Sequence, residues 1–137
     1  MLVDDDLSVR QTISLLLNVD HHIVITAPDA VEALDLLQRD RFDLVITDFD
    51  MPGILGDELA RRIKRQSPWQ PILMMTACPE KRPDLDNGVD AVLGKPFPLA
   101  DLRGAIAAVL NDSRRPGCAV HQSVSNNQDA RFPDKGA

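Results

Sequence analysis

Short apolar runs rich in valine, isoleucine and leucine recur along most of the chain. They cover residues 2–3, 23–25, 44–46, 72–75 and 91–93. Because the apolar positions are continuous and do not alternate with polar ones, each run predicts a strand that is buried on both faces. Such strands are typical of a parallel sheet covered by helices.

Amphipathic stretches separate these runs. The spacing of their apolar residues predicts helices over residues 8–18, 29–39, 57–65 and 99–110. Ser8 or Asp6 can cap the first helix, and Pro28 and Asp29 stand at the start of the second. The alternation of strand and helix predicts an α/β fold, a doubly wound five-stranded parallel sheet of the flavodoxin-like type.

The helical pattern fails between residues 78 and 88. Pro79, Pro83 and several charged residues leave room for at most one short helical turn near Leu85, which predicts a shortened fourth helix. Beyond Asn111 the chain turns to Ser, Asn, Gln, Pro and Gly, a composition that buries too little apolar surface to fold. We therefore expect one domain over residues 1–111 and a disordered tail over residues 112–137.

Polar side chains follow four of the five predicted strands. In chain order they are Asp4, Asp5 and Asp6, then Asp48 and Asp50, then Thr76, then Lys95. The carboxyl ends of parallel strands share one edge of a sheet, so residues far apart in sequence can form one pocket there. Taken singly, an aspartate often only caps a helix, a lysine often only pairs with an acid, and a threonine often only ends a strand. The ordered set as a whole favours a site.

The residue types in this set indicate a metal-dependent reaction on phosphate. Clustered carboxylates repel one another unless a cation lies between them, and a few oxygen ligands favour Mg²⁺ completed by water. A carboxylate beside Mg²⁺, a lysine ammonium and a threonine hydroxyl has a nucleophile and the charge neutralisation that phosphoryl transfer needs. The expected product is an aspartyl phosphate.

The same residues resemble the CheY-like receiver domain of two-component response regulators. The resemblance is carried by residues 2–6 (LVDDD), 43–53 (DLVITDFDMPG), 71–77 (PILMMTA) and 94–97 (GKPF), and it covers about residues 1 to 111. It implies the fold expected above and a role in phosphorelay signal transduction rather than enzymatic turnover.

The resemblance also implies a role for each site residue. Asp48 would be the phosphoacceptor; Asp5, Asp48 and the backbone carbonyl of Asp50 would hold Mg²⁺, with Asp4 acting through water. Lys95 would contact the phosphoryl group, beside Thr76, the switch hydroxyl, and Ala77. Val92 stands where many receivers carry an aromatic switch residue, and Pro96 would follow a cis peptide bond.

The family's partners follow from the same resemblance. The phosphoryl group would come from a sensor histidine kinase or a histidine phosphotransfer protein, which would contact the rim of the pocket at Asp6, Leu7, Arg10 and Phe97. A protein target, not identified by the sequence, would read the signal. The reduced fourth helix argues against the family's usual dimer face, so we expect a monomer or a weak dimer.

Composition and charge exclude several other classes. The net charge is −6, although the segment from Ser113 onward holds four basic and two acidic side chains, so the expected domain is strongly acidic and unsuited to nucleic acid. Neither a signal peptide nor a membrane span is expected, and Cys78 and Cys118 are expected to be unpaired. We expect a cytoplasmic receiver that acts on its own or is a fragment of a longer protein.

Two alternatives stay open. One is a pseudo-receiver that folds and binds a partner but is never phosphorylated, because the first strand is brief and the fourth crossover is reduced. The other is a haloacid-dehalogenase-type phosphatase, because residues 48–50 read Asp-Phe-Asp after an apolar strand. That family, however, places its motif near the N-terminus and a second acidic pair after the lysine.

Overall fold

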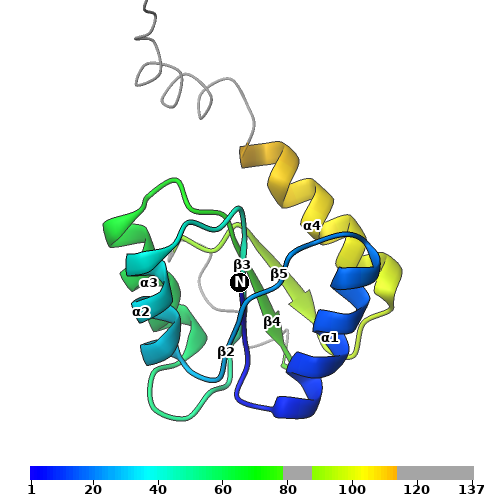
Figure 1. Cartoon of the computed structure of the whole chain (residues 1–137), viewed down its shortest axis with the longest axis horizontal. Helices are drawn as coiled ribbons and strands as arrows, with labels where there is room; N and C mark the ends of the chain where they lie inside the picture. The colour runs from blue at the N-terminus through cyan, green and yellow to red at the C-terminus, as the bar shows by residue number, and fades with distance from the viewer. Residues whose placement is uncertain (79–87, 114–137) are drawn as a thin grey trace, which may run out of the picture.

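The computed structural model describes residues 1–78 and 88–113. Five parallel strands form one sheet in the order β2-β1-β3-β4-β5, which confirms the doubly wound architecture (Figure 1). The strands are β1 (Leu2–Val3), β2 (Thr26–Ala27), β3 (Val45–Asp48), β4 (Ile72–Thr76) and β5 (Ala91–Gly94). The helices are α1 (Leu7–Val19), α2 (Ala30–Arg39), α3 (Gly56–Gln66) and α4 (Leu99–Ser113).

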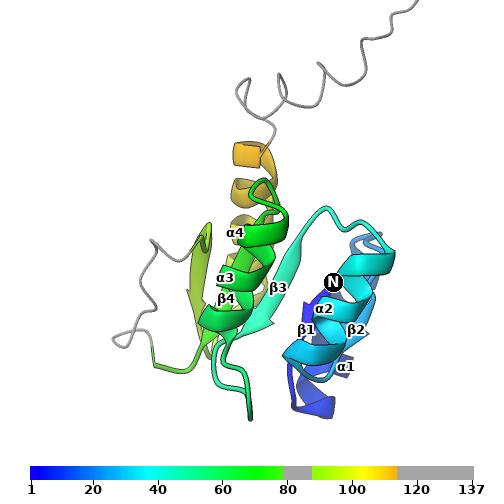
Figure 2. The ribbon, with the colours of Figure 1, turned by 90° about the vertical axis from the view of Figure 1, so that its left-hand side faces the viewer.

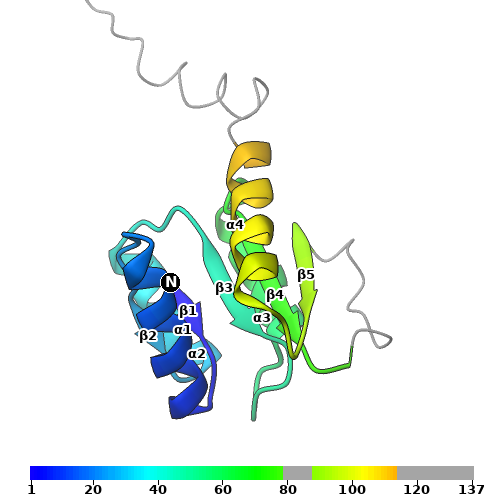
Figure 3. The ribbon, with the colours of Figure 1, turned by 90° about the vertical axis from the view of Figure 1, so that its right-hand side faces the viewer.

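The helices cover the two faces of the sheet in pairs. Helices α1 and α4 lie on one face and α2 and α3 on the other (Figures 2 and 3). Alternate strand residues therefore enter different cores: Leu2, Ile46 and Leu73 pack toward α1 and α4, and Val3 and Val45 pack toward α2 and α3. All five are almost fully buried, as the continuous apolar runs predict.

Carboxylates fix the starts of the first two helices. Asp6 is the N-cap of α1, and its side chain accepts hydrogen bonds from the backbone N–H groups of Ser8 and Val9. The Ser8 hydroxyl also donates to Asp6 at 2.7 Å, and together these bonds lower the pKa of Asp6. Asp29 caps α2 by accepting from the N–H of Glu32 at 2.8 Å. Of the two caps considered for α1, the structure uses Asp6.

The predicted second strand is displaced along the chain. The apolar run over residues 23–25 precedes β2, and Ile23 is 92% exposed. The ladder pairs Leu2 with Thr26 and Val3 with Ala27. Because only these two residues of β1 take part, only two residues of β2 acquire strand pairing, and the more apolar segment before them stays outside it.

The remaining boundaries differ by a few residues. Strand β3 includes Asp48 and β4 includes Thr76 as their last residues, and α4 continues past the expected Leu110 to Ser113. The predicted shortened fourth helix falls on residues 79–87, and most of the predicted disordered tail on residues 114–137, both outside the described residues. Across residues 1–78 and 88–113, no helix has the length and apolar character needed to span a membrane.

Candidate functional site

Three carboxylates meet at the carboxyl edge of the sheet. Asp4 and Asp5 follow β1 and Asp48 ends β3, and one carboxylate oxygen of each lies within 4.8 Å of the others. The two strands are direct neighbours, with Val3 paired to Thr47. The expected convergence of the acidic residues from the first and third strands is therefore present.

The two members of the acidic pair differ in their surroundings. Asp4 is 1% exposed; its Oδ1 accepts from the backbone N–H of Asp6 at 2.9 Å and its Oδ2 lies 3.3 Å from Lys95 Nζ. Asp5 is exposed, and its carboxylate has no protein partner in the described part of the chain. Because both Asp4 oxygens are engaged, Asp5 and Asp48 are the carboxylates better placed to bind a cation directly.

Lys95 joins the cluster from the end of β5. Its Nζ lies 3.0 Å from Asp48 Oδ1, and its backbone N–H donates to the Thr76 carbonyl at 2.7 Å. Burial disfavours the charge on Lys95, but the hydrogen bond and the attraction to Asp48 outweigh burial and raise its pKa. The lysine is therefore a permanent cation in this pocket.

Burial dominates the electrostatics of Asp48. Asp48 is 6% exposed, and desolvation of its carboxylate raises the pKa of this group. Lys95 opposes this effect, whereas the negative charges of Asp4 and Asp5 add to it. Since the pKa is raised overall, the charged form of Asp48 lacks sufficient positive compensation from the protein alone.

Thr76 ends β4 beside this group. It is fully buried and pairs with Gly94, the residue before Lys95. Its Oγ1 accepts from the backbone N–H of Cys78 at 3.1 Å, which shapes the turn that carries the exposed Ala77. Asp48 in turn pairs with Met75, so the phosphoacceptor candidate and the threonine end adjacent strands.

The loop between β3 and α3 carries Asp50. A hydrogen bond from the Gly56 N–H to the Phe49 carbonyl at 2.9 Å closes this loop, and Met51 of the loop is buried, at 4% exposure, in the core on the α2 and α3 side. A Cβ on Gly56 would meet the Asp48 carbonyl and lie 2.9 Å from the Phe49 Cα. Asp50 itself is exposed, and its carboxylate is not a member of the three-carboxylate cluster.

The remaining predicted residues lie on or after β5. Val92 pairs with Met74 and packs, partly buried, against the core on the α2 and α3 side. The Lys95–Pro96 peptide bond is cis, as the resemblance implies. Phe97 packs against the opposite core, toward α4.

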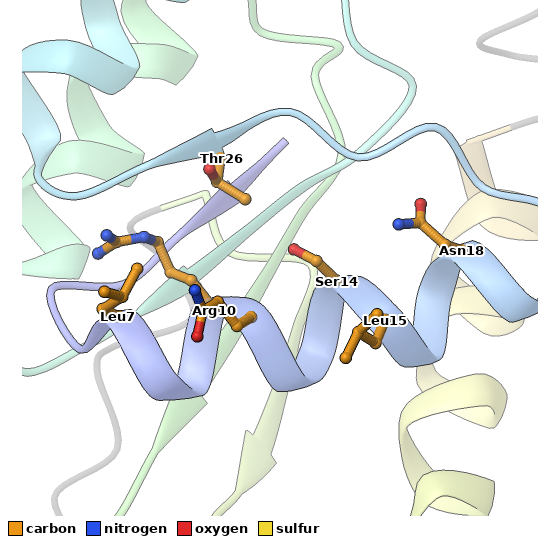
Figure 4. A pocket seen from close by; sticks show the side chains of 7 residues that line it. Leu7, Arg10, Ser14, Leu15, Asn18 and Thr26 are labelled. Atoms are coloured by element: carbon orange, nitrogen blue, oxygen red, sulfur yellow. The ribbon is translucent and has the colours of Figure 1, made fainter.

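The rim residues expected on α1 line a groove beside β2. Leu7 and Arg10 take part in it, together with Leu15, which was not among the expected rim residues (Figure 4). Arg10 also donates from Nη1 to the backbone carbonyl of Asp4 at 2.6 Å. That bond, like the contact of Gly56 with the Asp48 backbone, was not predicted from the sequence. The close approach at Gly56 had one signal in the sequence, namely a glycine at the start of a helix.

Comparison with known families defines the class of protein. The family model for the response regulator receiver domain matches residues 1–107. The chain belongs to this family of signalling domains. It is similar to response regulator MprA of Mycobacterium leprae, 35% identical over 91% of this chain and 56% of the relative. MprA of Mycobacterium sp. (strain KMS) is 38% identical over 80% of this chain and 49% of the relative. The chain thus spans about half the length of these relatives.

Solved structures give the same fold. A response regulator receiver domain protein from Clostridium thermocellum matches with a TM-score of 0.76 at 29% identity, over 82% of this chain and 94% of the other. The chemotaxis response regulator CheY4 of Vibrio cholerae matches with 0.73 at 37% identity, over 79% and 94%. TrrA of Thermotoga maritima, in complex with Mg(2+)-BeF, matches with 0.74 at 30% identity, over 79% and 95%.

Proposed function

We propose that Asp48 accepts a phosphoryl group in a Mg²⁺-dependent reaction and that the chain thereby relays a two-component signal. The observation that carries the proposal is the meeting of Asp4, Asp5 and Asp48 within 4.8 Å, with Lys95 at 3.0 Å from Asp48. One ammonium among three carboxylates leaves the group short of positive charge. A phosphoacceptor site needs such a deficit, because a divalent cation and a phosphoryl group enter it together.

The donor set fits Mg²⁺. The exposed carboxylate of Asp5 and the Asp48 carboxylate would bind the ion directly, with the Asp50 carbonyl from the β3–α3 loop as a third protein oxygen. Asp4, whose two carboxylate oxygens accept from the Asp6 backbone and contact Lys95, would act through water. Few protein oxygens and open positions for water and phosphate suit Mg²⁺. When bound, the ion would supply charge neutralisation to the phosphoryl oxygens.

The side chains divide the reaction between them. A carboxylate oxygen of Asp48 attacks the phosphorus, a new P–O bond forms, and the bond from phosphorus to the donor imidazole nitrogen breaks. The Lys95 ammonium offsets the negative charge that gathers on the phosphoryl oxygens. Thr76 gives up its Cys78 contact and turns its hydroxyl to the phosphoryl group, which links the reaction to the loop after β4. Val92 stands where many receivers carry an aromatic switch residue, so no aromatic ring takes part in the switch at this position.

We further propose that the phosphodonor protein docks along α1. Leu7, Leu15 and Val19 are 58%, 67% and 69% exposed, and with Gln11 they form a ridge of every fourth residue. Such a ridge fits the groove of another helix. The ridge starts next to Asp5 and Asp6, so a helix lying along it would bring a phosphohistidine to the pocket.

Binding of beryllium fluoride, which mimics a phosphoryl group, tests the site. With Mg²⁺ and fluoride present, ¹⁹F NMR of the full chain should show a protein-bound signal that disappears in Asp48→Asn and after removal of Mg²⁺ by EDTA. A folded wild-type protein without a bound signal would contradict the proposal and favour a pseudo-receiver.

Docking has its own matched pair of variants. Leu15→Asp should slow transfer from an autophosphorylated histidine kinase by about tenfold, because a charge in the centre of an apolar contact removes on the order of 1.4 kcal/mol. Val31→Asp is the control, since Val31 is 68% exposed on α2, away from the ridge. Equal rates for both variants with the kinase, or slowing of Leu15→Asp with acetyl phosphate, would contradict docking on α1.

A further inference from the structure

Arg10 holds the backbone at the point where the acidic pair leaves the sheet. The ladder between β1 and β2 is followed by a bond from the Asp4 N–H to the Ala27 carbonyl at 3.2 Å. The Asp4 carbonyl then accepts from Arg10 Nη1 at 2.6 Å. Figure 4 shows the arginine reaching from the first turns of α1 toward the loop that follows β1. Where the pairing of β1 with β2 ends, the charged guanidinium of Arg10 thus supplies the hydrogen bond to the backbone carbonyl of Asp4.

Asp5 depends on this anchor more than Asp4 does. Asp4 is fixed by its carboxylate contacts to the Asp6 N–H and to Lys95 as well as by its backbone. Asp5 is exposed, and its carboxylate is unpaired in the described part of the chain. The peptide between the two residues is planar, so the direction of the Asp4 carbonyl sets the direction in which the chain reaches Asp5.

We infer that Arg10 is a positioning residue for the cation site, acting on Asp5 through the Asp4 carbonyl; this inference rests on the proposed function. The guanidinium is better suited to the task than an ammonium, because its planar fork holds a donor in a fixed direction. Its charge also lies next to an acidic cluster without occupying the carboxylate oxygens of Asp5. Arg10 is thereby assigned to the site itself, in addition to the rim that meets a partner.

Titration of Mg²⁺ into the full chain by calorimetry tests the inference with four proteins: wild type, Arg10→Ala, Arg10→Lys and Arg103→Ala. Arg10→Ala should bind Mg²⁺ about tenfold more weakly, the usual size of effect for a group that orients a metal ligand. Arg10→Lys keeps a donor and should lose less. Arg103 is the matched control, because it also anchors α1, through bonds of 2.7 and 2.8 Å to Asp20 at the opposite end of the helix. Arg103→Ala should bind Mg²⁺ as the wild type does.

A second measurement distinguishes a positioning role of Arg10 from contact with a partner protein, because acetyl phosphate needs no partner. The Arg103→Ala control distinguishes it from a general loosening of α1. With acetyl phosphate as donor, Arg10→Ala should need about tenfold more Mg²⁺ for half-maximal phosphorylation but approach the wild-type rate at saturation. Mg²⁺ affinity of Arg10→Ala within twofold of wild type, or an equal loss in Arg103→Ala, would overturn the inference alone. A wild-type chain that binds no Mg²⁺ would overturn the proposed function and this inference with it.

Discussion

Asp48 is the residue at which burial and charge oppose each other. Its side chain is nearly inaccessible, Lys95 attracts it, and Asp4 and Asp5 repel it. The raised pKa means that the folded state binds a proton at Asp48 more readily than the unfolded state does. This group therefore lowers stability as the pH rises above 3.8, and the penalty persists at neutral pH while the site holds no cation.

Asp48→Asn should consequently stabilise the metal-free protein, on the order of 1 kcal/mol, because it removes one of the repelling charges. Urea unfolding at pH 7 in EDTA measures the change. Asp90→Asn is the control: the Asp90 carboxylate accepts from the Ile72 N–H at 2.8 Å and from Lys64 at 3.2 Å, so its neutralisation should destabilise the fold. A less stable Asp48→Asn protein would argue against charge conflict at Asp48.

Lys95→Ala should slow phosphorylation by acetyl phosphate about a hundredfold, because it removes the cation that offsets charge on the transferred group. Lys64→Ala provides the comparison, since Lys64 pairs with Asp90 at 3.2 Å and lies on α3. Rates measured at saturating Mg²⁺ should separate the two variants. Equal rates for Lys95→Ala and the wild type would exclude a role for Lys95 in the reaction.

The Met1 ammonium gives the fold a dependence on pH near neutrality. It donates to the Leu44 carbonyl at 2.8 Å, and burial lowers its pKa from 8.0 to about 6, with a smaller opposing effect from Asp43. Between pH 6 and pH 8 the ammonium of the unfolded chain keeps the proton that the folded chain has released. The free energy of unfolding should therefore rise from pH 6 to pH 8, by about 2 kcal/mol at most. Urea midpoints at the two pH values measure it. An Nα-acetylated chain, which lacks this titration, should show a smaller difference.

Among the elements, helix α3 fixes the position of the β3–α3 loop, because Gly56 packs against the backbone of Asp48 and Phe49. Gly56 begins α3 against the backbone of Asp48, so Gly56→Ala should push the loop away and destabilise the protein by about 2 kcal/mol. Gly104 lies in α4 with no atom within 4 Å of an added Cβ, and Gly104→Ala should stabilise by about 1 kcal/mol. Thermal unfolding of both variants measures the contrast. Stabilisation by Gly56→Ala would show that the close approach is not required.

The elements themselves were largely predictable. A continuous run of apolar residues predicts a buried strand such as β4. The helical spacing of apolar residues, with Asp29 at the start, predicts α2. The position of β2 was not predictable, because pairing with Leu2 and Val3 decides it and the local apolar run over residues 23–25 points elsewhere. The meeting of Asp48, Thr76 and Lys95 was predictable because each stands at the end of an apolar strand, and the carboxyl ends of parallel strands share one edge of a sheet. The bond from Arg10 to the Asp4 carbonyl was not, because it depends on side-chain direction.

In the molecule as a whole, one sheet edge gathers groups that span residues 4 to 95, so a cation that binds there would also stabilise the fold. Mg²⁺ at ten times its dissociation constant should stabilise the wild type by about 1.4 kcal/mol. Asp5→Asn should lose most of this gain, whereas Asp57→Asn, a change on α3, should keep it. Melting curves with and without Mg²⁺ measure the difference. Equal gains in all three proteins would indicate that the ion binds elsewhere.

Intact mass after incubation with acetyl phosphate and Mg²⁺ shows whether Asp48 accepts a phosphoryl group. The wild-type chain should gain one phosphoryl group, and this gain should be lost on removal of Mg²⁺ and absent from Asp48→Asn. A folded wild-type chain that binds Mg²⁺ yet gains no mass, or an Asp48→Asn chain that gains the same mass, would contradict Asp48 as the phosphoacceptor.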